Sequence, residues 1–267
     1  MPNMIVPNPT VQPTTPELQH LHTHMVKTYF VLRRGLAYIA IGFPLLLWWG
    51  GAFVGIELKG SMSAYYHSPM RNFFVGLLFA VGLCLYLYKG FSNKENIILN
   101  LAGAFAVGVA LFPTGESQLH GPCALLLFAC MFYVSWFTHG DTVKYILDEK
   151  RAALYRRTYK ILAFAMFACP AIAAVLIGLL AWDTEHKGFL FAVELGGIWA
   201  FAAYWLVKSR EIERTREDAA KAAAQLPVQP QPELVAPPPD DRISMAPTAG
   251  PPVARLPQRR RARDRRR

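Results

Sequence analysis

The sequence predicts an all-α fold: a six-helix transmembrane bundle with disordered cytoplasmic tails. Three observations support this prediction. Apolar residues make up 53% of the 267 residues and the mean hydropathy is +0.23, which exceeds what soluble domains show. The apolar residues gather in six stretches between short polar loops. Basic residues gather in alternate loops, the pattern that orients helical membrane proteins.

The first 34 residues are predicted to precede the membrane domain. Residues 1–14 are rich in Pro, Thr and Asn, a composition typical of a disordered lead. Thr15 and Pro16 suit the N-cap and the first position of a helix. Apolar residues then recur three and four apart, so residues 15–34 are predicted to form an interfacial helix on the membrane.

The transmembrane domain is predicted to cover residues 35–209. Several of its apolar stretches are at the short end of the roughly 17 to 25 residues that a spanning helix needs. The predicted spans are residues 36–54, 73–88, 97–112, 122–137, 161–182 and 189–207. Residues 210–226 are predicted to continue the last helix as a cytoplasmic extension, and residues 227–267 to form a disordered tail rich in Pro and Arg.

The charge distribution predicts the orientation. With a cytoplasmic N terminus, fifteen Lys and Arg residues flank the spans on the inner side, whereas the outer loops hold only Lys59, Arg71 and Lys187. Both termini are therefore predicted to be cytoplasmic, with the protein in the bacterial inner (plasma) membrane. The net charge of +10 is attributed to topology, so no specific nucleic acid is expected, and the basic C-terminal tip is expected to meet anionic lipid.

Polar residues gather in the predicted outer loops. One loop carries an imidazole, hydroxyls, phenols and a guanidinium within about ten residues, and Glu194 lies about 9 Å past Gly188 along the last span. A carboxylate at that depth is unfavourable unless it is paired, so Glu194 is expected to pair with Arg71, His120 or His67. The candidate pocket residues are Ser63, Tyr66, His67, Arg71, Glu116, His120, Asp183, His186 and Glu194.

These residues support two functional hypotheses. In the first, the outer pocket binds or senses a lipid or a small molecule. In the alternative, His67, His120 and Glu194 hold zinc with an open position for water, and the protein is a membrane-embedded, metal-dependent hydrolase of lipid head groups or amides. Haem ligation by His67 and His120 is a third interpretation. A transport pathway has less support, because paired broken helices are not evident.

The chain contains the strings SMSAYYHSPMRNFFVG, VALFPT, LHG with an apolar run, and ELGGIWAFAAYWLVK. In these strings it resembles a family of bacterial polytopic membrane proteins that carry a domain of unknown function. The resemblance covers residues 33–209 and implies no activity. The family pattern has an acid where this chain has Asn72. Ser63 and His67 also match the Ser-x-x-x-His step of the alkaline ceramidase and progestin and adipoQ receptor superfamily, whose members bind zinc. That superfamily has seven spans and a late His-x-x-x-His pair, which this chain lacks.

Overall fold

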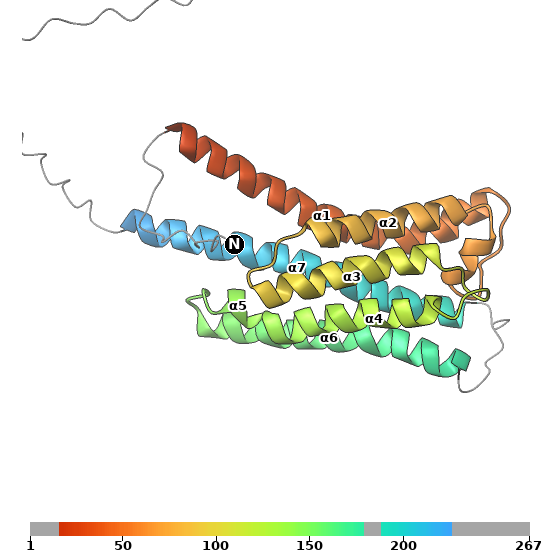
Figure 1. Ribbon diagram of the computed structural model, residues 1–267. Coiled ribbons are helices and arrows are strands. Elements are labelled where there is room, and N and C mark those ends of the chain that lie inside the picture. The colour runs from red at the N-terminus through yellow and green to blue at the C-terminus, as the bar shows by residue number, and fades with distance from the viewer. Residues whose placement is uncertain (1–15, 179–187, 226–267) are drawn as a thin grey trace, which may run out of the picture. The chain divides into compact units, whose positions relative to one another are not determined.

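The computed structural model describes residues 16–178 and 188–225, and all of its regular elements are helical (Figure 1). The all-α bundle predicted from the sequence is therefore confirmed. The predicted disordered lead (1–14) and Pro/Arg-rich tail (227–267) lie outside the described residues. The main helices are α1 (Pro16–Phe53), α2 (Arg71–Leu87), α3 (Asn93–Leu111), α4 (His120–Tyr133), α5 (Gly140–Val143), α6 (Glu149–Gly178) and α7 (Phe189–Gln225).

Five helical stretches of the described chain are long and apolar enough to cross a membrane. They lie in α1, α3, α6 and α7, and in the continuous segment His120–Val143 that includes α4 and α5. The remaining bundle helix, α2, is apolar but has only 17 residues. The chain is thus a membrane-embedded helical bundle, since helices satisfy their own backbone groups in lipid.

Two helices differ from the predicted spans in their continuity. The predicted boundary between an interfacial helix and the first span, at residues 34 and 35, falls inside the uninterrupted helix α1. The fourth span does not end as an α-helix: after Tyr133 it continues as η2 (Val134–Thr138), a π-helical turn. Such turns are rare and often lie at functional sites.

Neighbouring helices run antiparallel through short connections, and α2 packs closely on α3. Small residues permit this approach: a Cβ atom on Gly103 would lie 2.7 Å from the carbonyl oxygen of Gly82. Helices in lipid associate through such close packing because lipid tails are as apolar as the helices themselves. Further packed pairs are α6 with α7, α3 with α4, α1 with α7 and α4 with α6.

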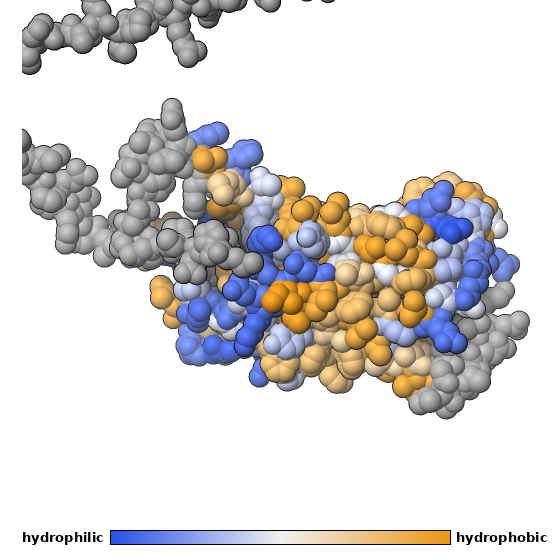
Figure 2. All heavy atoms as spheres, viewed as in Figure 1, coloured by the Kyte–Doolittle hydropathy of each residue, from blue (hydrophilic) through white to orange (hydrophobic). Residues whose placement is uncertain are grey.

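Polar residues of the bundle gather at its two ends, which a band of apolar surface separates (Figure 2). We call one the His120 end (residues 54–71, 112–120 and 188–194) and the other the Lys208 end (residues 29–34, 88–95, 139–160 and 208–215). The segments between the ends contain no Asp, Glu, Lys, Arg or His within the described chain. These segments are residues 35–53, 72–87, 96–111, 121–138, 161–178 and 195–207.

Candidate functional site

At the His120 end, Ser63 and His120 are in direct contact. Ser63 begins η1 (Ser63–His67), a 3-10 turn, and His120 begins α4 with 6% of its surface exposed. The Nδ1 atom of His120 lies 2.7 Å from the carbonyl oxygen of Phe112 and must donate to it. In the neutral ring, Nε2 then accepts from the Ser63 hydroxyl at 3.0 Å. Both ring nitrogens are therefore occupied by contacts that join the loops.

The other predicted residues of the first two loops form two contacts, of which that of His67 is exposed and that of Arg71 with the buried Tyr66 is partly buried. His67 Nε2 lies 2.7 Å from the Thr114 carbonyl oxygen, and Nδ1 lies 3.7 Å from a carboxylate oxygen of Glu116. Arg71 donates to the Tyr66 hydroxyl at 2.8 Å and stacks over its ring. The side chains of His67 and Glu116 are 43% and 69% exposed, so this part of the predicted pocket is a polar rim open to the surroundings.

The predicted partners of Glu194 are wrong for the described residues. Its Oε2 atom accepts a hydrogen bond from the backbone N–H of Met62 at 2.5 Å, not from Arg71, His120 or His67. The Gly60 carbonyl oxygen accepts from the backbone N–H of Phe191 next to it. The carboxylate thus satisfies a loop amide that folds over the start of α7. Sequence reasoning missed this partner because every residue except proline carries such an amide.

The three predicted zinc ligands do not come together within the described residues. No group of three His, Cys, Asp or Glu side chains that could hold a metal ion occurs there. Asp183 and His186 lie outside the described residues, so their part in the predicted pocket stays a prediction. Zinc binding and haem binding also stay predictions, and for His120 either would require a ring nitrogen to exchange its present partner.

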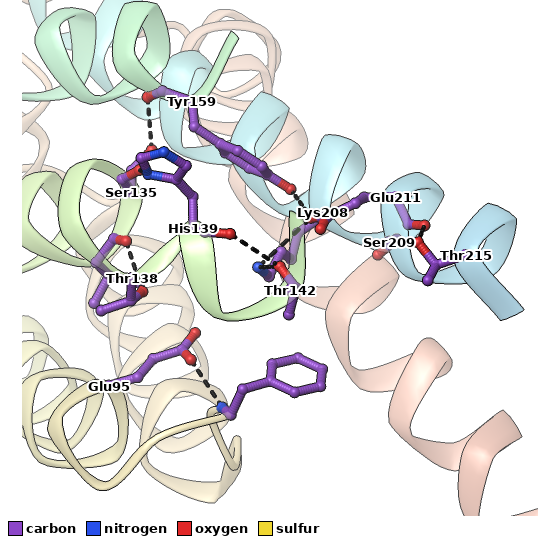
Figure 3. A network of polar contacts seen from close by, with 12 residues as sticks. Glu95, Ser135, Thr138, His139, Thr142, Tyr159, Lys208, Ser209, Glu211 and Thr215 are labelled. Atoms are coloured by element: carbon purple, nitrogen blue, oxygen red, sulfur yellow. Dashed lines mark hydrogen bonds and ion pairs between the residues drawn. The ribbon is translucent and has the colours of Figure 1, made fainter. Parts of the chain in front are cut away.

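The Lys208 end holds a cluster that sequence reasoning did not single out (Figure 3). We call four charged residues of this end the buried charge cluster: Arg33, Glu95, Lys208 and Glu211, each no more than 1% exposed, of which Figure 3 labels all but Arg33. They come from α1, α3 and α7. Charged side chains are almost never so fully buried unless they are paired, and inside a membrane protein they mark functional sites.

Lys208 and Glu211 pair with each other, although the Glu211 Oε1 atom has no hydrogen-bond partner within the described residues. Lys208 donates from Nζ to the Thr142 hydroxyl at 2.5 Å and lies 3.6 Å from Glu211. The Lys208 ammonium also lies 5.3 Å from the ring centre of Tyr159, a cation–π distance. The Tyr159 hydroxyl donates to Glu211 Oε2. Helices α5, α6 and α7 therefore meet at a neutral, hydrogen-bonded pair (Figure 3).

Glu95 is satisfied through only one of its oxygens. It lies in the first turn of α3, where the Ser92 hydroxyl accepts from its backbone N–H at 3.2 Å. Its Oε2 atom accepts from the backbone N–H of Phe91 at 2.8 Å, while Oε1 has no hydrogen-bond partner within the described chain. The positive end of the helix dipole favours a carboxylate here, which explains how the sequence S-N-K-E positions it.

Arg33 is the least satisfied member of the cluster. It is 0% exposed, yet none of its three guanidinium nitrogens has a hydrogen-bond partner among the described residues. Its carbon Cζ lies 4.5 and 4.7 Å from the ring centres of Tyr29 and Phe30. The adjacent Arg34 is different, because it is half exposed and donates to Glu213 at 2.8 Å.

Further unpartnered polar atoms lie next to Arg33 along a row of rings. Tyr29 stacks on Tyr88 with 5.0 Å between ring centres, and Tyr88 packs edge to face on Trp205 at 4.8 Å. The Tyr88 hydroxyl and the Trp205 Nε1 atom are buried and lack partners in the described residues. Buried polar groups in native proteins are hydrogen-bonded, so this region has the donors of a binding site.

The sequence contained one signal for this cluster. The Lys208 end is strongly basic, which the positive-inside rule explains, but it also carries Glu95, Asp141 and Glu211 near the apolar stretches. Acidic residues contribute little to orientation, so their presence there needed another explanation. Arg33 is predicted from the sequence only as a membrane-flanking charge, and Lys208 as such a charge and as the end of the string ELGGIWAFAAYWLVK. Their burial was missed because burial of individual side chains cannot be read from one sequence.

Comparisons of the chain with protein-family models, with curated proteins and with solved structures found no match. The two resemblances drawn from short sequence strings accordingly stay predictions. The geometry of the two ends therefore carries the functional argument.

Proposed function

We propose that this protein is a membrane-embedded binding protein whose ligand occupies the buried charge cluster at the Lys208 end. The observation that carries the proposal is the fully buried guanidinium of Arg33, which has no hydrogen-bond partner in the described residues. Guanidinium groups bind carboxylate and phosphate through paired hydrogen bonds. The ligand is accordingly a lipid or small molecule with an anionic group.

The charges of the cluster support a ligand that also has a hydrogen-bond donor. Lys208 and Glu211 offset each other at 3.6 Å, which leaves Arg33 and Glu95 without an ion pair between them in the described residues. Glu95 Oε1 and Glu211 Oε1 are buried acceptors without a hydrogen-bond partner in the described residues. An isolated buried ion costs several kcal/mol. A ligand with an acid and a hydroxyl or amine would offset both costs.

The apolar middle of the bundle favours binding over transport. Between the two polar ends the described segments contain no Asp, Glu, Lys, Arg or His, whereas conducting pathways through membranes use polar groups along their length. A ligand at the Lys208 end would therefore be retained and sensed there. The helices α1, α3 and α7 that supply the cluster are the elements whose packing such a ligand would change.

The proposal is tested with Arg33→Met in the purified full chain, with thermal unfolding measured in detergent. Without ligand, the variant should be as stable as the wild type or more stable, because an unpaired buried charge has been removed. Inorganic phosphate, acetate and short hydroxy acids are then titrated. At about 100 times its Kd, a ligand should stabilise the wild type by about 2.7 kcal/mol and leave the variant unchanged.

The matched control is Arg34→Met, which removes the neighbouring guanidinium from an exposed ion pair with Glu213. This variant should keep the full response to the ligand. If no anion of the series stabilises the wild type more than it stabilises the Arg33→Met variant, the Arg33 site does not bind an anion and the proposal fails.

The predicted pocket at the His120 end is the second candidate site. The observations that favour it are the exposed contact of His67 with Glu116 and the hydrogen bond from Arg71 to the hydroxyl of the buried Tyr66. Its metal-dependent hydrolase form is tested by the zinc content of the purified protein beside a His67→Ala, His120→Ala double variant. Stoichiometric zinc in the wild type alone would favour it, and equal, negligible zinc in both would remove it.

We also propose that the protein lies in the bacterial inner membrane with the Lys208 end on the cytoplasmic side. The support is the bias of basic residues toward that end. In this orientation the proposed ligand would reach the buried charge cluster from the cytoplasmic side.

A further inference from the structure

A groove of about 610 Å³ lies on the outside of the bundle, and no residue of the buried charge cluster lines it. It forms where α6 packs against η2. Its walls include Trp136 from the π-helical turn and Arg156, Arg157, Lys160 and Phe164 from α6. Three cations thus line a groove whose surface is otherwise mostly apolar.

The charges of this groove are only partly compensated by the protein. Arg156 donates to Glu149 at 2.5 Å, an ion pair whose carboxylate is 84% exposed. Arg157 and Lys160 have no carboxylate within 4 Å in the described part of the chain, and Lys160 lies 5.5 Å from the ring centre of Trp136. Two cations therefore remain for an anion from outside the protein.

The position of the groove along α6 indicates what that anion is. Lys160 is the last charged residue before the apolar segment 161–178, so it marks the border between the polar end and the apolar band. Ile161 and Phe164 follow directly and are 58% and 67% exposed. Trp136 suits the same border, because its ring is apolar and its N–H is polar.

We infer that this groove binds an anionic phospholipid. The phosphate group lies between Arg157 and Lys160, and the acyl chain follows Ile161 and Phe164 along α6. The π-helical turn at residues 134–138 provides the opposite wall through Trp136. Basic pockets between transmembrane helices commonly select anionic head groups, whereas a zwitterionic lipid would bring a choline cation toward the same two charges.

Native mass spectrometry tests this inference on the full chain in mixed micelles that contain equal amounts of dioleoyl phosphatidylglycerol and dioleoyl phosphatidylcholine. The wild type should retain the phosphatidylglycerol adduct in preference to the phosphatidylcholine adduct. An Arg157→Gln, Lys160→Gln variant should bind it about thirtyfold more weakly, from the usual contribution of two interfacial cations. Both side chains are exposed, so the variant should fold.

The matched control removes Lys144 and Lys150, two exposed cations of the same end that do not line the groove. Lys144→Gln, Lys150→Gln should keep the adduct. If both double variants lost the phosphatidylglycerol adduct equally, the effect would be one of general charge and the proposed site would be wrong. Equal retention of the two lipids by the wild type, or displacement of phosphatidylglycerol by the same concentration of inorganic phosphate, would also overturn the site.

A second measurement locates the lipid. Phosphatidylglycerol with brominated acyl chains should quench tryptophan fluorescence more in the wild type than in Trp136→Phe, which keeps an aromatic ring beside Lys160. With brominated phosphatidylcholine, the difference in fluorescence quenching between the wild type and Trp136→Phe should be smaller. An equal difference for both lipids would mean ordinary bilayer contact and would overturn the inference.

Discussion

At the residue scale, Lys208 and Glu211 show how a membrane protein keeps charges in its interior. Each charge has a partner of opposite sign, and each has a hydroxyl within hydrogen-bond distance, from Thr142 or Tyr159. Such a pair adds little net stability compared with apolar residues of the same size. Removal of only one partner is strongly destabilising, because the other charge then stays buried without a partner.

Lys208→Met should therefore lower the free energy of unfolding by about 3–5 kcal/mol, because the Glu211 carboxylate would stay buried without its cation. Unfolding of the detergent-solubilised protein by added SDS measures this loss. Lys150→Met, at an exposed position of the same end, should change stability by less than about 0.5 kcal/mol. Adding Glu211→Leu to Lys208→Met should recover part of the loss, and no recovery would contradict the pairing.

Glu194 allows a second test at this scale. Glu194→Gln keeps an oxygen that can accept from the Met62 N–H, whereas Glu194→Leu leaves that amide without its acceptor. The leucine variant should be less stable than the glutamine variant by about 1–3 kcal/mol. The same SDS unfolding measurement compares them. If the two variants were equally stable, the contact between the first loop and α7 would not matter for folding.

At the scale of elements, the closest contact between helices depends on glycine. The Gly82 and Gly103 backbones touch where α2 crosses α3, and a Cβ atom on either residue would meet the carbonyl oxygen of the other within 3.0 Å. Because α2, at 17 residues, is shorter than each of the five helical stretches that are long enough to cross a membrane, it depends strongly on this contact with its neighbour.

Gly103→Ala should destabilise the protein by about 1–3 kcal/mol, since backbone atoms cannot move aside as side chains can. Gly76→Ala is the matched control on α2: a Cβ atom there meets nothing within 4 Å, and alanine raises helix propensity by roughly 0.5–1 kcal/mol. In thermal unfolding, Gly76→Ala should have the highest Tm, the wild type an intermediate Tm and Gly103→Ala the lowest Tm. The reverse order would mean that the helices separate more easily than their contact suggests.

At the scale of the whole molecule, the described bundle has an apolar band between two polar ends (Figure 2). The His120 end has few cations and the Lys208 end many. This asymmetry predicts the orientation in the membrane, and the orientation decides which compartment supplies a ligand to each end.

A labelling experiment on intact cells tests the orientation. In a variant without Cys84, Cys123, Cys130 and Cys169, Gln118→Cys at the His120 end should react with a membrane-impermeant maleimide. Lys144→Cys at the Lys208 end should react only after the cells are opened. Both positions are exposed. Labelling of Lys144→Cys from outside the cell would reverse the proposed topology.

Several features could be predicted from the sequence because they depend on local composition. Apolar stretches of membrane-spanning length predict helices wherever the chain packs, and the helices of the described residues agree with that prediction. The contact of Ser63 with His120 joins two residues that the sequence had placed in one candidate pocket. The presence of charge at both ends was equally visible.

Only the tertiary structure decided which charges are buried and what they contact. Arg33 and Arg34 are neighbours of the same type, yet one is fully buried and the other pairs at the surface, because a turn of 100° per residue directs them to different sides of α1. Glu194 contacts a backbone amide, a group that leaves no mark in the residue pattern. The sequence therefore determined the helical, membrane-embedded class, and the packing of helix faces determined the candidate binding site.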